Sequence, residues 1–265
     1  MQSVDEIQKV AHPLKLRLLT VKARRMLGPD LVRITLGGTD LAGFYSPGFD
    51  DHVKLIFPEA GQSVPRLPQL GERGLVFPAG QPRPAMRDYT PRAWREAEQE
   101  LDIDFVLHGE GPACQWASAA RTGDKLGVAG PRGSFLVSTG FDWHVLIGDE
   151  TAIPAIARRL QELPAQAAVQ VFMLARNLQT LGALQAPDHV PVNWVPSFAG
   201  QSGLLDAVRN APAQAGRGHV WIAAESAVAK AMRQYWVQER GHDKTLVRAS
   251  SYWRQGEAAV HEQHD

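Results

Sequence analysis

The sequence changes its hydrophobic pattern once, near residue 140, and this change limits the folds that the chain can adopt. Before it, short runs that often alternate apolar with polar residues lie between glycine and proline turns, which indicates β-strands. Evenly spaced strands with tight turns favour a small antiparallel barrel. We expect its strands at 15–24, 30–38, 52–58, 87–92, 100–108 and 124–131.

After residue 140 apolar strands alternate with helical segments, which predicts a doubly wound parallel sheet. We expect helices at 151–163, with Thr151 as its N-cap, at 202–211 and at 226–241, which Gly241 closes. The expected strands lie at 143–149, 167–175, 192–197, 219–225 and 245–253. The predicted fold class is therefore β + α/β, with an antiparallel Greek-key β-barrel over 1–138 followed by a nucleotide-type α/β domain over 139–265. By analogy of fold alone, this order is common in proteins that pass electrons from a nicotinamide to a flavin.

Composition excludes several function classes. Lys plus Arg and Asp plus Glu number 28 each, so no net charge draws the chain toward nucleic acid or a membrane surface. The single cysteine, Cys114, excludes an internal disulfide framework and a cysteine-rich metal site. The first residues carry charges throughout, and no apolar run is long enough for a membrane helix, so we predict a cytoplasmic protein without membrane insertion.

A long segment, residues 59–85, contains five prolines and is expected to be a functional or disordered loop. It ends at Arg87, Tyr89 and Thr90, where a strand would place Arg87 and Tyr89 on one face. Arginine binds phosphate with a forked pair of hydrogen bonds, and tyrosine stacks on flat rings, so this group is typical of a cofactor contact. The alternative is a surface strand on which the arginine rests against the tyrosine.

A second candidate is HGEGPACQWA, residues 108–117, which joins a strand to a helix. Gly109 and Gly111 allow a ligand to approach the backbone, and the N–H groups at the following helix start bind phosphate. Pro112 and the small Ala113 suit that helix start. The alternative is a plain glycine turn.

The third candidate is GDETAIPAI, residues 148–156, which lies where a dinucleotide fingerprint would lie. It has one glycine instead of three, and Asp149 and Glu150 would repel a pyrophosphate. An ordinary turn between strand and helix, capped by Thr151, is the competing interpretation.

Isolated cations and a terminal motif complete the candidates. Lys54, Arg132 and Arg248 each stand alone among apolar or turn residues and, taken singly, indicate only solvated side chains. The terminal HEQHD, residues 261–265, contains an H-x-x-H pattern, but polar tails are usually disordered, so no metal site is predicted.

The chain resembles the siderophore-interacting protein family of FAD-containing ferric-siderophore reductases over about residues 14–256. The resemblance rests on the order of the segments RITLGGTDLAGF, HVKLIFP, RDYTPR, HGEGPACQWA, GDETAIPAI, HVWIAAES and SSYWRQG. It implies a ferredoxin-reductase-like architecture with an N-terminal FAD barrel and a C-terminal NAD(P)-type domain. It also implies that Arg87 faces the FAD pyrophosphate while Tyr89 stacks by the isoalloxazine.

The resemblance assigns roles to the candidate residues. It implies FAD contacts from Arg87, Asp88, Tyr89, Thr90, His108, Gly109, Gly111, Pro112, Ala113, Asp149, Thr151 and Ala152. It implies a basic site for the ferric siderophore at Lys54, Arg132 and Arg248, and nicotinamide contacts from Glu225 and Arg176. No catalytic side chain is implied, because the flavin supplies the redox chemistry.

The implied function is single-electron reduction of Fe(III) to Fe(II) in ferric siderophores, with electrons from NADPH or NADH through FAD. Anionic catecholate complexes are the expected substrates, because a few cations attract them. We predict a monomer that binds no nucleic acid. The alternatives are a reductase that takes electrons from ferredoxin, a general flavin reductase of the diaphorase type, and a binding protein in which FAD is structural.

Two positions depart from the family pattern. Ala224 replaces a glycine in the segment 221–225 and is expected to crowd an approaching cofactor. Arg176 follows the second strand of the α/β domain, where family members often have an acidic cluster. It either accepts a 2′-phosphate, which would favour NADPH over NADH, or is a solvated loop residue.

Overall fold

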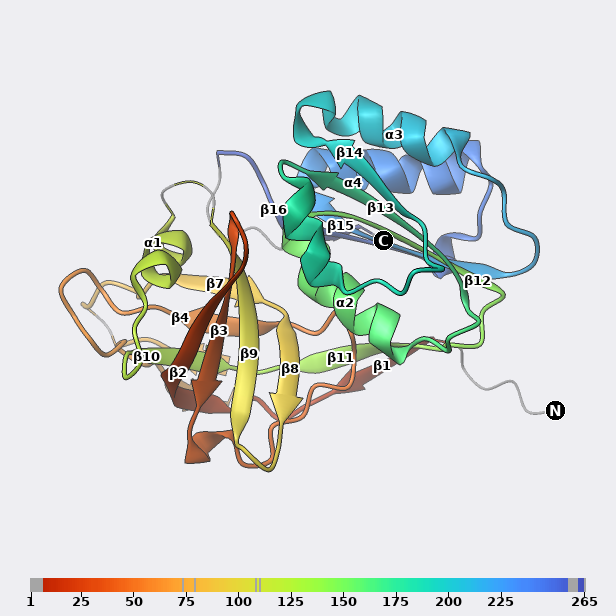
Figure 1. The fold of residues 1–265 in the computed structure, drawn as a ribbon. Coiled ribbons are helices and arrows are strands. Elements are labelled where there is room, and N and C mark those ends of the chain that lie inside the picture. Colours follow the sequence, from red (N-terminus) through yellow and green to blue (C-terminus); the bar gives the residue numbers. More distant parts are fainter. Residues whose placement is uncertain are drawn as a thin grey trace. The chain divides into compact units, whose positions relative to one another are not determined.

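The computed structural model of the protein describes residues 7–72, 74–78, 80–107, 109, 111–256 and 262–264. The chain divides into two compact units, Met1–Val137 and Ser138–Asp265 (Figure 1). Among the described residues, no helix combines the length and the apolar character that crossing a membrane requires.

The first unit is built on a seven-stranded antiparallel sheet with the order β7-β4-β10-β2-β3-β9-β8. Its two edge strands, β7 and β8, follow one another in the chain, so the sheet curves round as a half-barrel (Figure 1). A separate pair joins β1 (Ile7–Ala11) to β11 (Gly133–Val137). The strands of the large sheet are β2 (Leu16–Gly28), β3 (Leu31–Gly37), β4 (Val53–Ile56), β7 (Met86–Tyr89), β8 (Pro91–Arg95), β9 (Glu100–Val106) and β10 (Lys125–Ala129).

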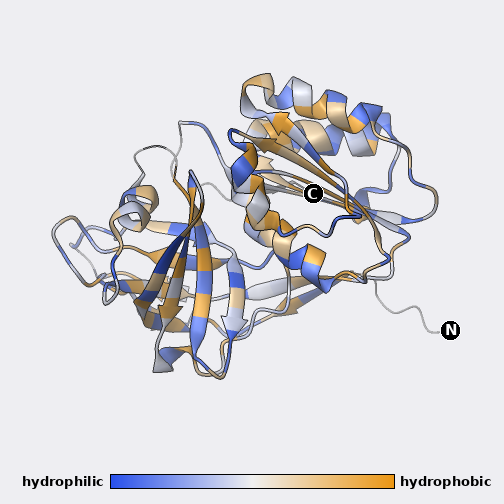
Figure 2. Cartoon of the chain, in the orientation of Figure 1, coloured by the Kyte–Doolittle hydropathy of each residue, from blue (hydrophilic) through white to orange (hydrophobic). Residues whose placement is uncertain are grey.

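Alternation along the strands places the core of this unit inside the half-barrel. In β3, Val32, Ile34 and Leu36 are fully buried in the core cluster, whereas Arg33 and Thr35 between them bind carboxylates of β9. Figure 2 shows the same pattern as bands of opposite hydropathy along the strands of this unit. The short helix α1 (Pro112–Ala119) adds Ala113 and Ala117 to the core. A 3₁₀ turn, η1 (Thr39–Leu41), follows β3.

The second unit contains a six-stranded sheet with the order β14-β13-β12-β15-β16-β17. All pairs are parallel except the last, which is antiparallel. The chain starts in the middle of the sheet and reverses its direction of progress between β12 and β15. In doubly wound sheets the ligand site lies outside the carboxyl ends of the strands at such a reversal, and we call this place the crevice. The strands are β12 (Trp143–Asp149), β13 (Ala168–Ala175), β14 (Val192–Pro196), β15 (Gly218–Glu225), β16 (Val247–Trp253) and β17 (Glu262–His264).

Helices cover both faces of this sheet. Trp143, Val145 and Ile147 of β12 face a core shared with α3 (Gly200–Asn210) and α4 (Ser226–Gln234). The opposite face of β12 meets α2 (Ile153–Glu162), since a Cβ added to Gly148 would collide with the Cβ of Ala152 and lie 3.6 Å from Ile156. The remaining short elements are η2 (Glu150–Ala152), η3 (Leu178–Leu184), η4 (Ser197–Ala199), the π-helical turn η5 (Tyr235–Glu239) and η6 (Lys244–Leu246).

The predicted fold is confirmed: an antiparallel half-barrel precedes a parallel sheet with helices. Two local predictions need correction. Thr151 is not the helix cap, because Asp149 accepts hydrogen bonds from the backbone N–H and the hydroxyl of Thr151 and so caps the 3₁₀ turn before α2. The expected loop 59–85 is not structureless, because a small hairpin forms between β5 (Gln69–Gly71) and β6 (Gly74–Val76).

Candidate functional site

The β7 segment pairs with β4, and this register determines its partners. Lys54 lies opposite Asp88, and Leu55 lies opposite Arg87. The Nζ atom of Lys54 is 2.6 Å from Oδ1 of Asp88, so these side chains form an ion pair. A cation predicted to bind the siderophore therefore pairs with an acid predicted to lie at the flavin. Thr90, directly after β7, is buried.

Tyr89 is the aromatic residue of this segment and packs on the wall of the half-barrel. Its ring lies 4.5 Å from that of Phe105, which in turn lies 5.8 Å from the ring of Trp116 in α1. Burial, with a smaller effect of Cys114, raises the pKa of the Tyr89 phenol, so the ring remains neutral at physiological pH. This aromatic chain connects β7 with α1 inside the first unit.

Arg87 is a half-buried cation whose guanidinium donates a hydrogen bond to the carbonyl oxygen of Met86 at 2.7 Å. Across the described ranges, no carboxylate forms an ion pair with Arg87. A guanidinium without an acidic partner remains able to bind a phosphate group.

The glycine turn before α1 leaves space for a ligand. Gly109 has a φ of +73°, in the left-handed region that glycine tolerates best. A Cβ added to Gly109 or Gly111 would meet no atom of the described chain within 4 Å. Gly111 precedes α1 without a side-chain cap, and Pro112 is the first helical residue. His108 lies outside the described residues.

The features of the first unit fit FAD. The first backbone N–H groups of α1, beginning at Ala113, have no intrahelical acceptor, and a helix start of this kind binds phosphate. Arg87 supplies a cation and Tyr89 a flat ring on neighbouring parts of the same wall. A dinucleotide with a pyrophosphate and a flat ring system requires this combination.

In the second unit, Asp149 lies at the crevice between β12 and β15. Its Oδ1 accepts two hydrogen bonds from Thr151, at 2.9 Å from the backbone nitrogen and 2.5 Å from the hydroxyl. Its Oδ2 accepts hydrogen bonds from the backbone N–H of Glu225 at 2.9 Å and the indole N–H of Trp253 at 2.8 Å. The carboxylate thus joins the ends of three strands. Burial raises its pKa above the ordinary value, although the hydrogen bonds oppose this effect.

The other predicted residues of the crevice also have partners within the chain. The Glu225 carboxylate accepts a hydrogen bond from Ala227 N at 2.6 Å and caps α4. Glu150 accepts hydrogen bonds from the backbone nitrogen of Arg176 at 2.6 Å and from its Nε at 3.4 Å. Ala152 is completely buried and packs beneath Gly148. The acids here therefore order the crevice through internal hydrogen bonds.

Ala224 does not crowd the crevice as expected. Strand alternation directs its side chain into the core between the sheet and helices α3 and α4, where it is fully buried. The methyl group therefore fills space in the protein interior. That part of the sequence interpretation is wrong.

Two of the three predicted substrate cations belong to the first unit. Lys54 pairs in register with Ala129 of β10, and Arg132 follows three residues later with an exposed side chain. Their strand ends are therefore neighbours. Arg248 belongs to the second unit, where it is half-buried on β16 opposite Trp221 of β15.

Sequence reasoning missed a group of exposed apolar side chains. Leu178 follows β13 and is 57% exposed, and Phe198 follows the neighbouring strand β14 and is 91% exposed. Trp194 on β14 is 38% exposed, and its indole N–H donates to the carbonyl oxygen of Ala175, at the end of β13, at 3.0 Å. Arg176 comes next in the chain, so this cation and Trp194 lie close to the carboxyl ends of parallel strands, where nucleotides bind. The sequence signal that could have identified this group is the presence of large apolar residues in a segment that is expected to be a turn.

These two sheets define the fold class: an antiparallel half-barrel followed by a doubly wound sheet is a ferredoxin-reductase-like fold. Models of a siderophore-interacting FAD-binding domain and of a siderophore-interacting protein match residues 20–135 and 141–256. The chain belongs to the siderophore-interacting protein family.

The sequences of known relatives align with nearly the whole chain. The NADPH-dependent ferric-chelate reductase of Escherichia coli is 39% identical over 93% of this chain and 96% of that protein. The ferric vibriobactin reductase ViuB of Vibrio cholerae is 33% identical over 98% of this chain and 96% of its own length. The crystal structure of a siderophore utilization protein from T. fusca matches with a TM-score of 0.87 at 36% identity, covering 96% of this chain and 98% of that chain.

Proposed function

We propose that this protein is an FAD-dependent reductase that uses NADPH to reduce ferric iron held by siderophores. Two relatives that match nearly their full length are named NADPH-dependent ferric-chelate reductase and ferric vibriobactin reductase. The structural observation that carries the proposal is the uncapped start of α1, which the rings of Phe105 and Trp116 connect to Tyr89. It lies within the segment that matches the FAD-binding domain.

The chain's own residues would bind and orient FAD. Arg87 pairs with the pyrophosphate, Tyr89 packs against the flat ring, and the N–H groups at the start of α1 bind phosphate oxygens. FAD held by these residues would supply the redox chemistry that links a two-electron nicotinamide donor to the one-electron reduction of iron. No side chain needs to act as a general acid or base for that transfer.

The crevice of the second unit is the proposed site of NADPH. Arg176 binds the 2′-phosphate. Within the chain, the charge of its guanidinium is partly balanced by Glu150, which forms an ion pair with it. The exposed Phe198 and Trp194 offer flat apolar surfaces to the adenine ring. Asp149 and Glu225 hold the strand ends in position through their hydrogen bonds.

The proposed substrates are ferric complexes of the anionic catecholate type. Lys54, Arg132 and Arg248 attract the negative complex and stabilise the charge that arrives with the electron. Reduction releases the metal, because hard oxygen donors bind Fe(II) more weakly than Fe(III). We further propose that the protein acts as a monomer in the cytoplasm.

Steady-state iron reduction tests this proposal. The purified protein is mixed with NADPH and a ferric triscatecholate, and ferrous iron is followed with a coloured ferrous chelator. We expect ferrous iron to form, the rate to fall when FAD is stripped, and added FAD to restore it. Activity with reduced ferredoxin alone would change the donor, and inactivity with both donors would refute the reductase.

A further inference from the structure

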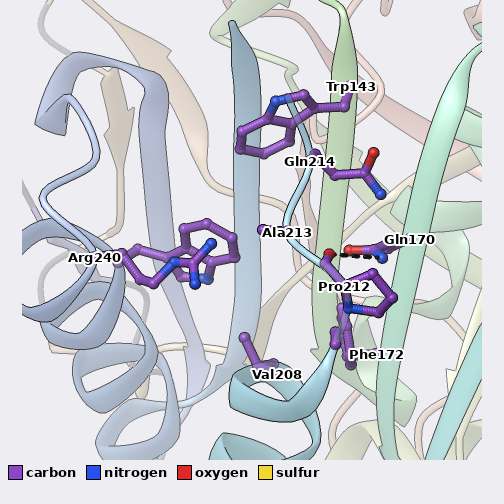
Figure 3. Close-up of a pocket in the computed structure, with 10 residues that line it drawn as sticks. Trp143, Gln170, Phe172, Val208, Pro212, Ala213, Gln214 and Arg240 are labelled. Atoms are coloured by element: carbon purple, nitrogen blue, oxygen red, sulfur yellow. Dashed lines mark hydrogen bonds between the residues drawn. The ribbon is translucent and has the colours of Figure 1, made fainter. Parts of the chain in front are cut away.

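The pocket beside Trp143 in the second unit is too small for a ferric complex. Arg240 lies on one side of it, and Gln170 with Pro212 lies on the other (Figure 3). The enclosed volume is about 20 Å³, which is room for about one water molecule. The surface beside Arg132 in the first unit is open and offers other contacts.

Tyr45 is an exposed aromatic residue in the loop between η1 and β4, and it is 62% exposed. Both of its neighbours in the chain are fixed. Phe44 is buried in the core of the half-barrel, and the Ser46 hydroxyl donates a hydrogen bond to Oδ2 of Asp51 at 2.9 Å. An exposed ring on a backbone that is fixed in this way is preorganised for contact with a ligand.

A hydrogen-bond chain orders the ring against which Tyr45 packs. The ring of His12 lies edge-on to that of Tyr45, with 5.4 Å between the ring centres. The Nε2 atom of His12 is 2.7 Å from Oγ of Ser134, and that hydroxyl donates to Oδ2 of Asp51 at 2.7 Å. Ser134 and Asp51 are both buried. The same carboxylate therefore orders the loop after the tyrosine and the imidazole beside it.

The histidine connects this arrangement with the proposed substrate cations of the first unit. The backbone N–H of His12 donates to the carbonyl oxygen of Arg132 at 2.8 Å, which extends the pairing of β1 with β11 by one residue. Residues directly opposite each other on antiparallel strands have neighbouring side chains. A Cβ added to Gly130 would lie 4.0 Å from the Cα of Val53, so the segment before Arg132 packs against the residue before Lys54.

Two exposed cations lie near the loop that carries Tyr45. One is Arg132, and the other is Lys15, whose Nζ atom would lie 3.5 Å from a Cβ added to Gly43. An aromatic ring next to cations suits an anionic ligand with flat rings, because the rings pack on the tyrosine and the cations attract the charge. Ferric catecholates have both properties, whereas ferric citrate has the negative charge without the rings.

We propose that Tyr45 is a specificity-determining residue that packs against an aromatic ring of the ferric complex. This inference rests on the proposed substrate site at Lys54 and Arg132. The tyrosine adds a ring contact at a small cost in conformational entropy, because its backbone and its histidine neighbour are already ordered. Anionic complexes without rings gain only the attraction of the cations, so the protein favours ferric complexes that carry aryl groups.

Gallium(III) triscatecholate and gallium(III) citrate test the proposal by calorimetric titration of the FAD-loaded protein. Gallium(III) has the charge of ferric iron and is not reduced, so binding is measured without turnover. We expect Tyr45→Leu to weaken the triscatecholate about fivefold and to leave the citrate unchanged. Tyr45→Phe keeps the ring and removes only the hydroxyl, so it should retain both affinities.

Leu70→Ala is the matched control, because it removes an exposed apolar side chain from β5 and should change neither affinity. The proposal is overturned if the wild type does not bind the triscatecholate, if Tyr45→Leu binds it as well as the wild type does, or if that variant weakens both complexes equally. Binding that depends on Tyr45 in a protein that does not reduce the ferric complex would support this inference and refute the reductase.

Discussion

The Nζ atom of Lys54 lies 2.6 Å from Oδ1 of Asp88, its direct partner across strands β4 and β7. The lysine side chain is 40% exposed and that of the aspartate 19%, so the pair lies at the surface of the half-barrel. Asp88 stands between Arg87 and Tyr89, the proposed FAD contacts. Lys54, which we propose to bind the substrate, therefore forms an ion pair with the strand that we propose to bind FAD.

Removing two of the proposed substrate cations should weaken the capture of anionic ferric complexes. We expect Lys54→Ala combined with Arg248→Ala to raise KM for a ferric triscatecholate about tenfold, because attraction between opposite charges falls. Bound FAD, measured by absorbance, should not change. Arg25→Ala, which removes an exposed cation of β2, is the control and should behave like the wild type.

Removing the carboxylate of the Lys54–Asp88 pair tests the same site in the opposite direction. Asp88→Asn releases the charge of Lys54 and should lower KM for the same complex, while the free energy of unfolding changes by less than about 1 kcal/mol, as for other surface pairs. If the double cation variant reduces the complex as well as the wild type does, the substrate site is misplaced.

Arg87 should control retention of FAD. Arg87→Ala removes the one cation that we assign to the pyrophosphate and should weaken FAD binding about tenfold or more, since contacts with charged groups contribute about 1.5–3 kcal/mol. FAD per protein after gel filtration provides the measurement. Arg83→Ala, an exposed neighbour in the preceding segment, should retain full FAD. Equal FAD content in both variants would remove Arg87 from the site.

Arg176 should decide between the two nicotinamide donors. Arg176→Ala deletes the proposed partner of the 2′-phosphate, so KM for NADPH should rise about tenfold while KM for NADH changes little. The backbone bond from residue 176 to Glu150 does not depend on this side chain and should preserve the crevice. A parallel rise in both KM values would instead indicate a structural role.

The second unit should lose stability in mild acid. His144 and His219 are adjacent in register on β12 and β15, and both are fully buried. Burial and the charge of Arg159 lower the pKa of His144 from 6.5 to about 4, and the same causes lower the pKa of His219. Both histidines are therefore neutral in the folded unit at pH 7.

The sign of this effect follows from proton uptake. Below pH 6.5 the unfolded chain binds protons that the folded unit excludes, so the free energy of unfolding falls until the pH reaches about 4. His144 alone should account for a loss of about 2 kcal/mol between about pH 7.5 and pH 5. Urea unfolding at both pH values checks this loss, which His144→Leu should reduce. A wild-type stability independent of pH over this interval would contradict the burial of neutral histidines.

Much of the fold was predictable because hydrophobic periodicity controls it locally. The alternation in β3 and the apolar run of β12 each specify a strand, and the change between the two patterns marks two kinds of sheet. The hairpin of β5 and β6 was missed because its three-residue strands are too short and too exposed to produce a period.

The site was only partly predictable, because partners depend on register. The sequence indicates Lys54 and Asp88 as chemically useful residues, but 34 positions separate them, and only the pairing of β4 with β7 brings them together. Asp149 likewise lies in the segment 148–156, which the sequence indicates as a candidate nucleotide site. Two of its hydrogen bonds come from Thr151, two residues further along the chain, whereas the other two come from Glu225 and Trp253, on strands that meet β12 only in the folded sheet.

The central claim is that electrons pass from NADPH through bound flavin to ferric iron. Anaerobic stopped-flow absorbance tests it directly when the yellow purified protein is mixed first with NADPH and then with a ferric triscatecholate and a ferrous trap. The account predicts bleaching in the first mixing and recovery of the colour in step with ferrous iron in the second. A protein that stays yellow with both NADPH and reduced ferredoxin, or that bleaches without then producing ferrous iron, would contradict it.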